Sequence, residues 1–336
     1  MKRQTFFKPA VYCSLIALTM LSAQLWAQPS SFRKGIYGDW QVKVEFGERQ
    51  MESILSFSRN AEGNMTGQWI SFWGMNELKD VKFEDNKLSF VQVVRFGDNE
   101  FTSNFTGMVE EGKMTGTLSS DRGDSKLEGK RSPRMSRASG NWEMKFKVGE
   151  WDITTNLIIK PDKEGKLTAQ WQSEYGEHEI TDIQYERGKL AFKRKSKFQD
   201  RQWDSTFEGS IQGDTLSGVI KSEMGDITAE GKQVGAPVIG TWNLDITSER
   251  GTRKQRLRVN PDMTGLYGST LIKKIDLKDN QVNFKIVLEF GDQTFEMDFK
   301  GKLAESKLVG EITSSRGSQK ITGTKVVRRY RRRSTS

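Results

Sequence analysis

The sequence predicts an all-β protein in which three antiparallel, up-and-down β-barrels of about 100 residues each follow one another along the chain. Two observations predict this fold. One pattern of glycines and apolar residues occurs three times in the same order, and within each copy apolar residues alternate with polar ones. In addition, no copy contains a convincing amphipathic helix. The predicted copies span residues 35–131, 138–233 and 238–325, and we call them repeats 1, 2 and 3.

A Gly-x-Trp triplet opens each repeat, at residues 38–40, 140–142 and 240–242. A leucine stands 17 positions after each opening glycine, and Phe-x-Gly and apolar-x-Gly-x-apolar segments follow in the same order. We expect a turn glycine 25 positions after each opening glycine, at Gly63, Gly165 and Gly265. Repeats 1 and 2 are offset by 102 residues throughout, whereas the offset from repeat 2 to repeat 3 falls from 100 to 92, which predicts an eight-residue deletion near Thr270. Such an ordered set of matches identifies an internal repeat.

Strict alternation is clear at the start of repeat 2, where apolar residues at 142, 144, 146 and 148 alternate with charged ones. A period of two is typical of strands that have one buried and one solvent-exposed face. Short turn signals separate about eight such strands in each repeat. Consecutive hairpins without a long crossover predict a meander, and closing the meander into a barrel removes its exposed edges. Short linkers at 132–139 and 234–239 join the repeats.

The first 27 residues have the features of a secretory signal peptide. Basic residues at positions 2, 3 and 8 precede an apolar run over 11–21, and small residues then allow cleavage after Ala27 or, less readily, after Ala23. The run is too short and wrongly flanked to anchor the chain in a membrane. We therefore expect an exported protein, periplasmic or extracellular. At the other end, we expect residues 326–336 to form a basic, disordered tail.

The composition excludes several classes of function. The net charge is +9, but three positive charges belong to residues 1–27 and five to the tail, which leaves +1 for residues 28–325. A nearly neutral body gives no basis for nucleic acid binding by the folded part. Cys13, the only cysteine, lies in the signal peptide, and His178 is the only histidine. We therefore expect no disulfide, no metal site and no cofactor.

The Gly-x-Trp on the first strand and a basic residue on the last strand resemble the calycin superfamily of lipocalin-like barrels. In that family the cation packs over the indole and closes one end of the barrel. The resemblance implies structural pairs of Trp40 with Arg131 and of Trp242 with Lys325. In repeat 2 the cognate of the cation is Gln233, so Trp142 keeps its structural role without that partner unless Lys232 takes its place by a register shift. The resemblance also implies an apolar or glycan-sized ligand.

His178 lies in the charged segment 174–179, which we interpret as a loop between strands. A catalytic triad would need this histidine as its base, and a solvated loop histidine is the simpler interpretation. The neighbouring carboxylates Glu177 and Glu179 suggest an alternative, acid–base chemistry on a glycan. Acidic residues are abundant on exposed strand faces, so we assign no catalytic residue.

Repeat 2 departs from the other repeats in its aromatic and charged residues. By strand parity Arg194 faces inward, where repeats 1 and 3 have Gln92 and Ile286. A buried arginine requires a carboxylate, water or an anionic ligand. The other interpretation is an arginine at the barrel end that reaches solvent. We predict that any ligand cavity lies in repeat 2 and is lined by Trp171, Trp203 and Arg194.

These observations lead to two hypotheses of different class. The first is an exported, non-catalytic binding or scaffold protein of the cell envelope, which holds a small apolar, amphipathic or glycan ligand in a barrel. The alternative is a secreted enzyme that processes glycans or small metabolites, with its site in repeat 2. A catalytic repeat should have an open, polar-lined cavity that the others lack. The arginines of the tail suggest contact with an anionic membrane surface, or else a solubilising terminus.

Overall fold

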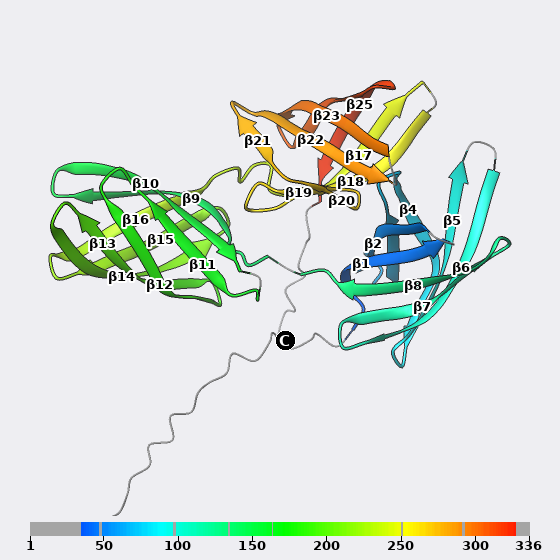
Figure 1. Ribbon diagram of the computed structural model, residues 1–336, viewed down its shortest axis with the longest axis horizontal. Coiled ribbons are helices and arrows are strands. Elements are labelled where there is room, and N and C mark those ends of the chain that lie inside the picture. The colour runs from blue at the N-terminus through cyan, green and yellow to red at the C-terminus, as the bar shows by residue number, and fades with distance from the viewer. Residues whose placement is uncertain are drawn as a thin grey trace, which may run out of the picture. The chain divides into compact units, whose positions relative to one another are not determined.

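The computed structural model describes residues 35–46, 49–96, 99–133, 135–162, 164–249, 251–290 and 293–326. The predicted signal peptide, 1–27, lies outside the described residues, and so does all of the predicted tail except Val326. Within the described part of the chain, the regular elements are 25 strands arranged in three antiparallel sheets (Figure 1). This arrangement confirms the predicted all-β fold of three tandem, barrel-like sheets.

Each sheet is a meander of consecutive hairpins. Repeat 1 contains β1 (Gly38–Phe46), β2 (Arg49–Arg59), β3 (Met65–Ile70), β4 (Met75–Glu84), β5 (Lys87–Phe96), β6 (Asn99–Glu110), β7 (Lys113–Ser120) and β8 (Gly123–Arg131). Repeat 2 contains β9 (Gly140–Val148), β10 (Trp151–Pro161), β11 (Leu167–Gln172), β12 (Glu177–Glu186), β13 (Lys189–Phe198), β14 (Arg201–Gln212), β15 (Thr215–Ser222) and β16 (Gly225–Gln233). Repeat 3 contains β17 (Gly240–Ser248), β18 (Gly251–Val259), β19 (Gly265–Tyr267), β20 (Thr270–Ile272), β21 (Ile275–Lys278), β22 (Gln281–Phe290), β23 (Gln293–Ala304), β24 (Lys307–Ser314) and β25 (Gly317–Lys325).

The three sheets differ in how fully they close. Repeat 1 is a closed barrel, in which every strand pairs with the next and β8 returns to pair with β1. In repeat 2 the ladder runs from β11 through β9 and β16 to β12, so β11 and β12 are the two ends of the sheet. Their counterparts in repeat 1, β3 and β4, are paired with each other. Repeat 3 likewise ends at β20 and β21. Repeat 2 therefore has a seam between β11 and β12 that repeat 1 lacks.

The Gly-x-Trp tryptophans lie at the heart of each core. Trp40, Trp142 and Trp242 are at most 1% exposed. Each indole N–H donates to the backbone carbonyl oxygen four residues earlier, at 2.7, 2.9 and 2.8 Å respectively. The hydrogen bond satisfies the one polar atom of a side chain that is otherwise apolar. The chain entering each repeat is thereby fixed against the first strand.

The Phe-x-Gly motif is explained by stacked rings that lie over paired glycines. In repeat 2, Phe192 and Phe207 stack with centroids 4.9 Å apart, and Gly209 pairs across the ladder with Gly218. A Cβ at Gly218 would lie 2.6 Å from Cζ of Phe207, which is closer than van der Waals contact allows. The same stacked pair and glycine pair occur in the other two repeats. The glycines are therefore required by the ring that covers them.

The prediction that Gly265 is a turn glycine of repeat 3 is wrong. Gly265 lies on β19, where it pairs with Val259, and Met263 takes the turn position with a φ of 61°. The corresponding pair in repeat 2 is Ile159 with Ala169, so the hairpin of repeat 3 is four residues shorter. The predicted eight-residue deletion near Thr270 is thus divided between this hairpin and the segment after Tyr267. A Cβ at position 265 would lie 2.8 Å from Cδ1 of Ile275, which explains why glycine stands there.

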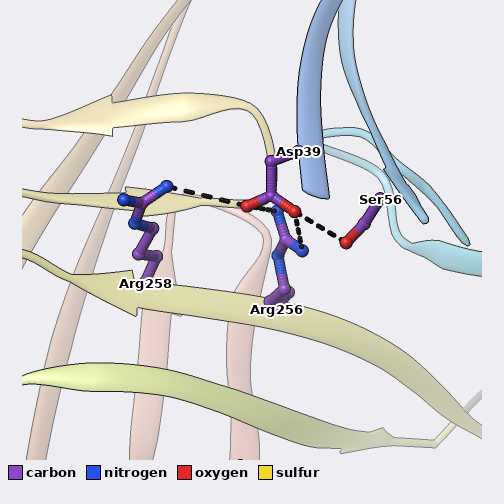
Figure 2. Close-up of polar contacts among 4 residues, drawn as sticks. All are labelled: Asp39, Ser56, Arg256 and Arg258. Carbon is purple, nitrogen blue, oxygen red and sulfur yellow. Dashed lines mark hydrogen bonds and ion pairs between the residues drawn. The ribbon is translucent and has the colours of Figure 1, made fainter. Parts of the chain in front are cut away.

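Repeats 1 and 3 meet at a largely buried carboxylate, Asp39, which no sequence pattern singled out. Asp39, on the outer face of β1, accepts hydrogen bonds at 3.2 Å from both terminal nitrogens of Arg256 on β18 (Figure 2). Arg258 lies 3.6 Å from the same carboxylate, and the Ser56 hydroxyl donates to it at 2.6 Å. Burial alone would raise the pKa of Asp39, but the two arginines and the serine outweigh it and hold the pKa below its ordinary value. We call these four residues the Asp39 cluster.

A loop of repeat 1, residues 71–74, also enters repeat 3. The Gln255 side-chain amide donates to the carbonyl oxygens of Ser71 and Phe72 at 3.0 and 2.9 Å, and Arg253 donates to that of Trp73 at 2.9 Å. Phe72 packs against the core of repeat 3, with its ring 6.3 Å from that of Tyr267. Repeats 1 and 3 are therefore joined by an ion-pair cluster and by an inserted aromatic loop.

We expect Asp39→Asn to lower the free energy of unfolding by about 3–5 kcal/mol at neutral pH, because Arg256 would remain charged and buried without its counter-ion. The pKa of Asp39 is lower in the folded protein than in the unfolded chain, so its contribution is complete above the ordinary value of 3.8 and is lost as the pH falls through the folded pKa. The difference between wild type and variant should therefore shrink below about pH 3.8. Urea unfolding of both proteins at several pH values measures this difference in the free energy of unfolding.

The matched control is Asp245→Asn, which removes the same charge from an exposed position on β17. That variant should change stability by less than about 0.5 kcal/mol. Equal stabilities for Asp39→Asn and wild type at neutral pH would contradict a stabilising Asp39 cluster.

Candidate functional site

The interior of repeat 2 contains a buried arginine. Arg194 lies on β13 on the same face as Leu190 and Phe192, and it is 8% exposed. The matching positions in repeats 1 and 3 are also buried, but they carry the uncharged Gln92 and Ile286. A positive charge at this position of the repeat is therefore particular to repeat 2.

The contacts of Arg194 leave its charge without a counter-ion. Its Nε donates to the Ser205 hydroxyl at 3.2 Å, and the guanidinium carbon lies 4.5 Å from the centre of the Trp171 ring. Among the described residues, no carboxylate forms an ion pair with it. Burial lowers the pKa of Arg194 to about 10, so the group still carries its charge at neutral pH. A cation–π contact and one neutral hydrogen bond offset only part of the cost of burying that charge.

His178 lies beside this arginine, and its assignment to a solvated loop is wrong. The loop ends at Gly176, and β12 already includes His178, which pairs with Ser196. The His178 ring is 6.4 Å from the Trp171 ring, and its Nδ1 is 2.9 Å from the Ser196 hydroxyl oxygen. Burial, and then the positive charge of Arg194, lower the pKa of His178 below its ordinary value. The imidazole is therefore neutral at pH 7.

Two buried polar atoms on β10 and β12 have no hydrogen-bond partner among the described residues. They are Nε2 of His178 and the hydroxyl oxygen of Thr155, a residue that is 3% exposed. Buried polar atoms are normally satisfied, so unpaired ones indicate places where a bound group or water can supply the partner. Nε2 of His178 therefore offers a bound group a hydrogen bond in the neighbourhood of the Arg194 cation.

Of the three residues predicted to line a cavity, the structure brings two into contact. Trp171 and Arg194 stack, whereas Trp203, on β14, is half-buried on the same face as Ser205 and nearer the end of the barrel. The hollow of about 520 Å³ that repeat 2 contains is lined by none of them. It follows the seam between β11 and β12 and is lined by Lys166, Leu167, Thr168, Ala169, Ile180, Thr181, Asp182, Ile183 and Tyr185.

Sequence reasoning missed this hollow because alternation shows which face of a strand is buried but not whether two neighbouring strands pair. The apolar side chains that line it, among them Leu167, Ile180 and Ile183, also pack against the core of repeat 2. Ile180 is in turn the ladder partner of Arg194. One residue that lines the hollow is thus paired with Arg194 across the ladder.

Exposed apolar side chains surround one end of the repeat 2 barrel. They lie in or directly beside the four connections that join β9 to β10, β11 to β12, β13 to β14 and β15 to β16. These connections share one end of an up-and-down sheet. The residues are Val148 (44% exposed), Trp151 (76%), Tyr175 (50%), Phe198 (42%) and Met224 (75%). We call this end the mouth of repeat 2. Apolar groups clustered in this way are typical of interaction sites.

At the opposite end of repeats 1 and 3, a basic side chain packs over the tryptophan of the Gly-x-Trp triplet. The guanidinium of Arg131 lies 4.4 Å from the Trp40 ring, and the ammonium of Lys325 lies 5.5 Å from the Trp242 ring. In repeat 2 Gln233 pairs with Trp142 in the ladder, and its amide donates to the Ser139 carbonyl oxygen at 3.1 Å. The tryptophan end of repeat 2 therefore has a neutral amide where repeats 1 and 3 have a cation.

The described residues contain no group of three or more His, Cys, Asp or Glu side chains placed to hold a metal ion. They also form no helix with the length and apolar character that a membrane span requires.

No family model matches the chain, and no curated protein matches it. Solved structures with some likeness include a candidate outer membrane protein from Bacteroides fragilis, 15% identical, covering 59% of this chain and 96% of that one with a TM-score of 0.24. A protein of unknown function from Nostoc punctiforme is 12% identical over 86% of this chain and 96% of that one, with a TM-score of 0.22. A variant of transferrin binding protein B from Haemophilus parasuis is 10% identical over 88% and 77%, with a TM-score of 0.21. Likenesses this low do not bear on what this chain binds.

The environment of His178 can be measured directly, because it is the only histidine in the sequence. We expect its imidazole proton resonances to titrate below the ordinary value of 6.5, and Arg194→Gln to raise that pKa by removing a nearby positive charge. NMR titration of wild type and variant gives both values. Arg187→Gln, which removes an exposed charge from another connection, should leave the pKa unchanged. A wild-type pKa at or above 6.5 would contradict the arrangement described.

Proposed function

We propose that this protein is an exported, non-catalytic binding protein of the cell envelope, and that its second repeat holds the anionic group of a small amphipathic ligand at Arg194. The single observation that carries the proposal is the buried guanidinium without a counter-ion among the described residues. Bringing an anion to such a site recovers the attraction that burial of the arginine alone forgoes. Export rests on the sequence of residues 1–27.

The surroundings of Arg194 support a ligand with both an anionic and an apolar part. His178, whose pKa the Arg194 charge lowers, has an unpaired Nε2 that can hydrogen-bond to the anionic group. The seam between β11 and β12 and the exposed side chains of the mouth supply apolar surface within the same repeat. A mostly apolar site with a few convergent polar groups is the usual form of a small-molecule site.

The alternative of a glycan-processing enzyme is less well supported. Glu177 and Glu179 are both exposed on β12, whereas His178 between them faces the interior. The carboxylates therefore lie on the opposite face of the strand from Arg194 and do not share a site with it. Contact between the basic tail, 326–336, and an anionic membrane surface remains a separate proposal that rests on the sequence alone.

Titration with the fluorescent anion anilinonaphthalene sulfonate tests the proposal. We expect Arg194→Gln to raise the Kd of this probe about tenfold or more, because the sulfonate loses a charge-assisted hydrogen bond. Glutamine is the residue that repeat 1 carries at this position, so the fold can accept it. Arg187→Gln is the control for loss of one charge and should bind the probe as wild type does.

A second probe, the uncharged N-phenylnaphthylamine, separates recognition of the anion from adsorption to apolar surface. Its Kd should be the same for wild type and Arg194→Gln. If the sulfonate probe also binds both proteins equally, Arg194 does not recognise anions and the proposed function is wrong.

A further inference from the structure

The contact between repeats 1 and 3 shows what the mouth of one of these barrels can receive. Loop 71–74 of repeat 1 lies against β18 and Tyr267 of repeat 3, with its carbonyl oxygens held by Arg253 and Gln255. The Trp73 ring lies 6.4 Å from Phe295, the repeat 3 counterpart of Trp203. One end of repeat 3 is thus filled by an aromatic loop from another repeat.

Repeat 2 presents the same receiving positions with different chemistry. Trp171 is the counterpart of Tyr267, since each pairs across the ladder with the leucine that follows the Gly-x-Trp. Thr155 stands at the position of Gln255, and its hydroxyl is buried without a partner among the described residues. The mouth of repeat 2 carries apolar side chains that are still exposed, including Trp151 at 76%.

Repeat 2 also has a loop equivalent to the inserted one. Residues 173–176 read Ser-Glu-Tyr-Gly, and residues 71–74 read Ser-Phe-Trp-Gly. In both loops the serine hydroxyl accepts a hydrogen bond from the backbone N–H two residues later, at 3.0 and 3.2 Å. The two loops share this hydrogen bond, although Gly176 has a φ of 104° and Gly74 is not among the glycines with a positive φ. In the alignment of the repeats, Glu174 occupies the position of Phe72.

This substitution complements the charge of the site. In repeat 3 the inserted Phe72 lies beside Tyr267, and in repeat 2 the counterpart of Tyr267 is Trp171, on which the Arg194 guanidinium stacks. A loop inserted into repeat 2 in the same way would therefore bring its second residue to Arg194. Loop 173–176 of another molecule would bring the carboxylate of Glu174 to that cation.

We infer that two copies of this chain associate through the mouths of their second repeats, each inserting loop 173–176 into the other, with Glu174 of one copy paired with Arg194 of the other. A two-fold dimer requires each copy to carry both halves of the contact, and repeat 2 does. The contact of repeats 1 and 3 already sets equivalent loops against each other, because Gly268, in the connection between β19 and β20, lies against Ser71.

The inference goes beyond the proposed function, since it names a second copy as a competing occupant of the same cation. Ligand and second copy should exclude each other, because both use the guanidinium of Arg194. An anionic ligand would then shift the protein from dimer to monomer by mass action.

Sedimentation velocity of the full chain over a range of concentrations tests the inference. We expect a concentration-dependent dimer whose Kd rises at least tenfold in Glu174→Gln and in Arg194→Gln. Glu174 is exposed, so its substitution does not threaten the fold. The control is Glu223→Gln, which removes an equal charge from another connection of the same mouth and should dimerise as wild type does.

Two outcomes overturn the inference: a chain that stays monomeric at all concentrations, or a dimer that Glu174→Gln does not weaken. Addition of anilinonaphthalene sulfonate to the wild type supplies the competition test and should favour the monomer. At protein concentrations well below the dimer Kd, where both proteins are monomeric, Glu174→Gln should bind this probe with the wild-type Kd. If the dimer is absent while probe binding depends on Arg194, the dimer is rejected and the proposed function stands. If Arg194→Gln weakens dimerisation but does not change probe binding, the proposed function is rejected and the dimer stands.

Discussion

Closure of each sheet around a buried tryptophan is the constraint on which the rest of the structure depends. The first strand of each repeat pairs with both the second strand and the last, so it is the point where the meander returns on itself. The indole at that point is fixed by a hydrogen bond to the chain that precedes the strand. Because the tryptophan of the first strand faces inward, the pairing of the strands decides which alternate side chains of each strand face the interior and which face solvent. The inward position of Arg194 follows from that assignment.

Much of the fold was accessible from the sequence because it follows from periods. The period of two gave the strands, the offset of 102 gave the repeats, and short turns gave the meander. Parity likewise placed Arg194 with Leu190 and Phe192, because nothing interrupts the alternation along β13. The same reasoning failed at His178. A charged segment reads equally as a loop or as the start of a strand, and only pairing with Ser196 decides between them.

Other features depend on contacts that no local pattern records. Asp39 and Arg256 are 217 positions apart, and each looks like an ordinary polar residue on the exposed face of a strand. The seam between β11 and β12 depends on hydrogen bonds that repeat 1 forms at its corresponding strands and repeat 2 does not. Position 265 was misjudged because glycine serves both in turns and where a neighbouring side chain leaves no room for a Cβ. The hollow and the contact of repeats 1 and 3 therefore came from the structure alone.

The Asp39 cluster also constrains the order in which the molecule can be completed. Repeat 1 is synthesised first and can close its own barrel at once, since its strands pair only with one another. The arginines that neutralise Asp39 and the side chains that hold loop 71–74 belong to β18, which leaves the ribosome only after the whole of repeat 2. Until then Phe72 and Trp73 are presented to solvent, and the carboxylate has no partner from repeat 3. Joining repeats 1 and 3 also requires the chain to close a loop of 217 residues between Asp39 and Arg256, which adds an entropic cost to this contact. A nascent chain halted within repeat 2 would thus be folded in its parts and still display an adhesive aromatic loop.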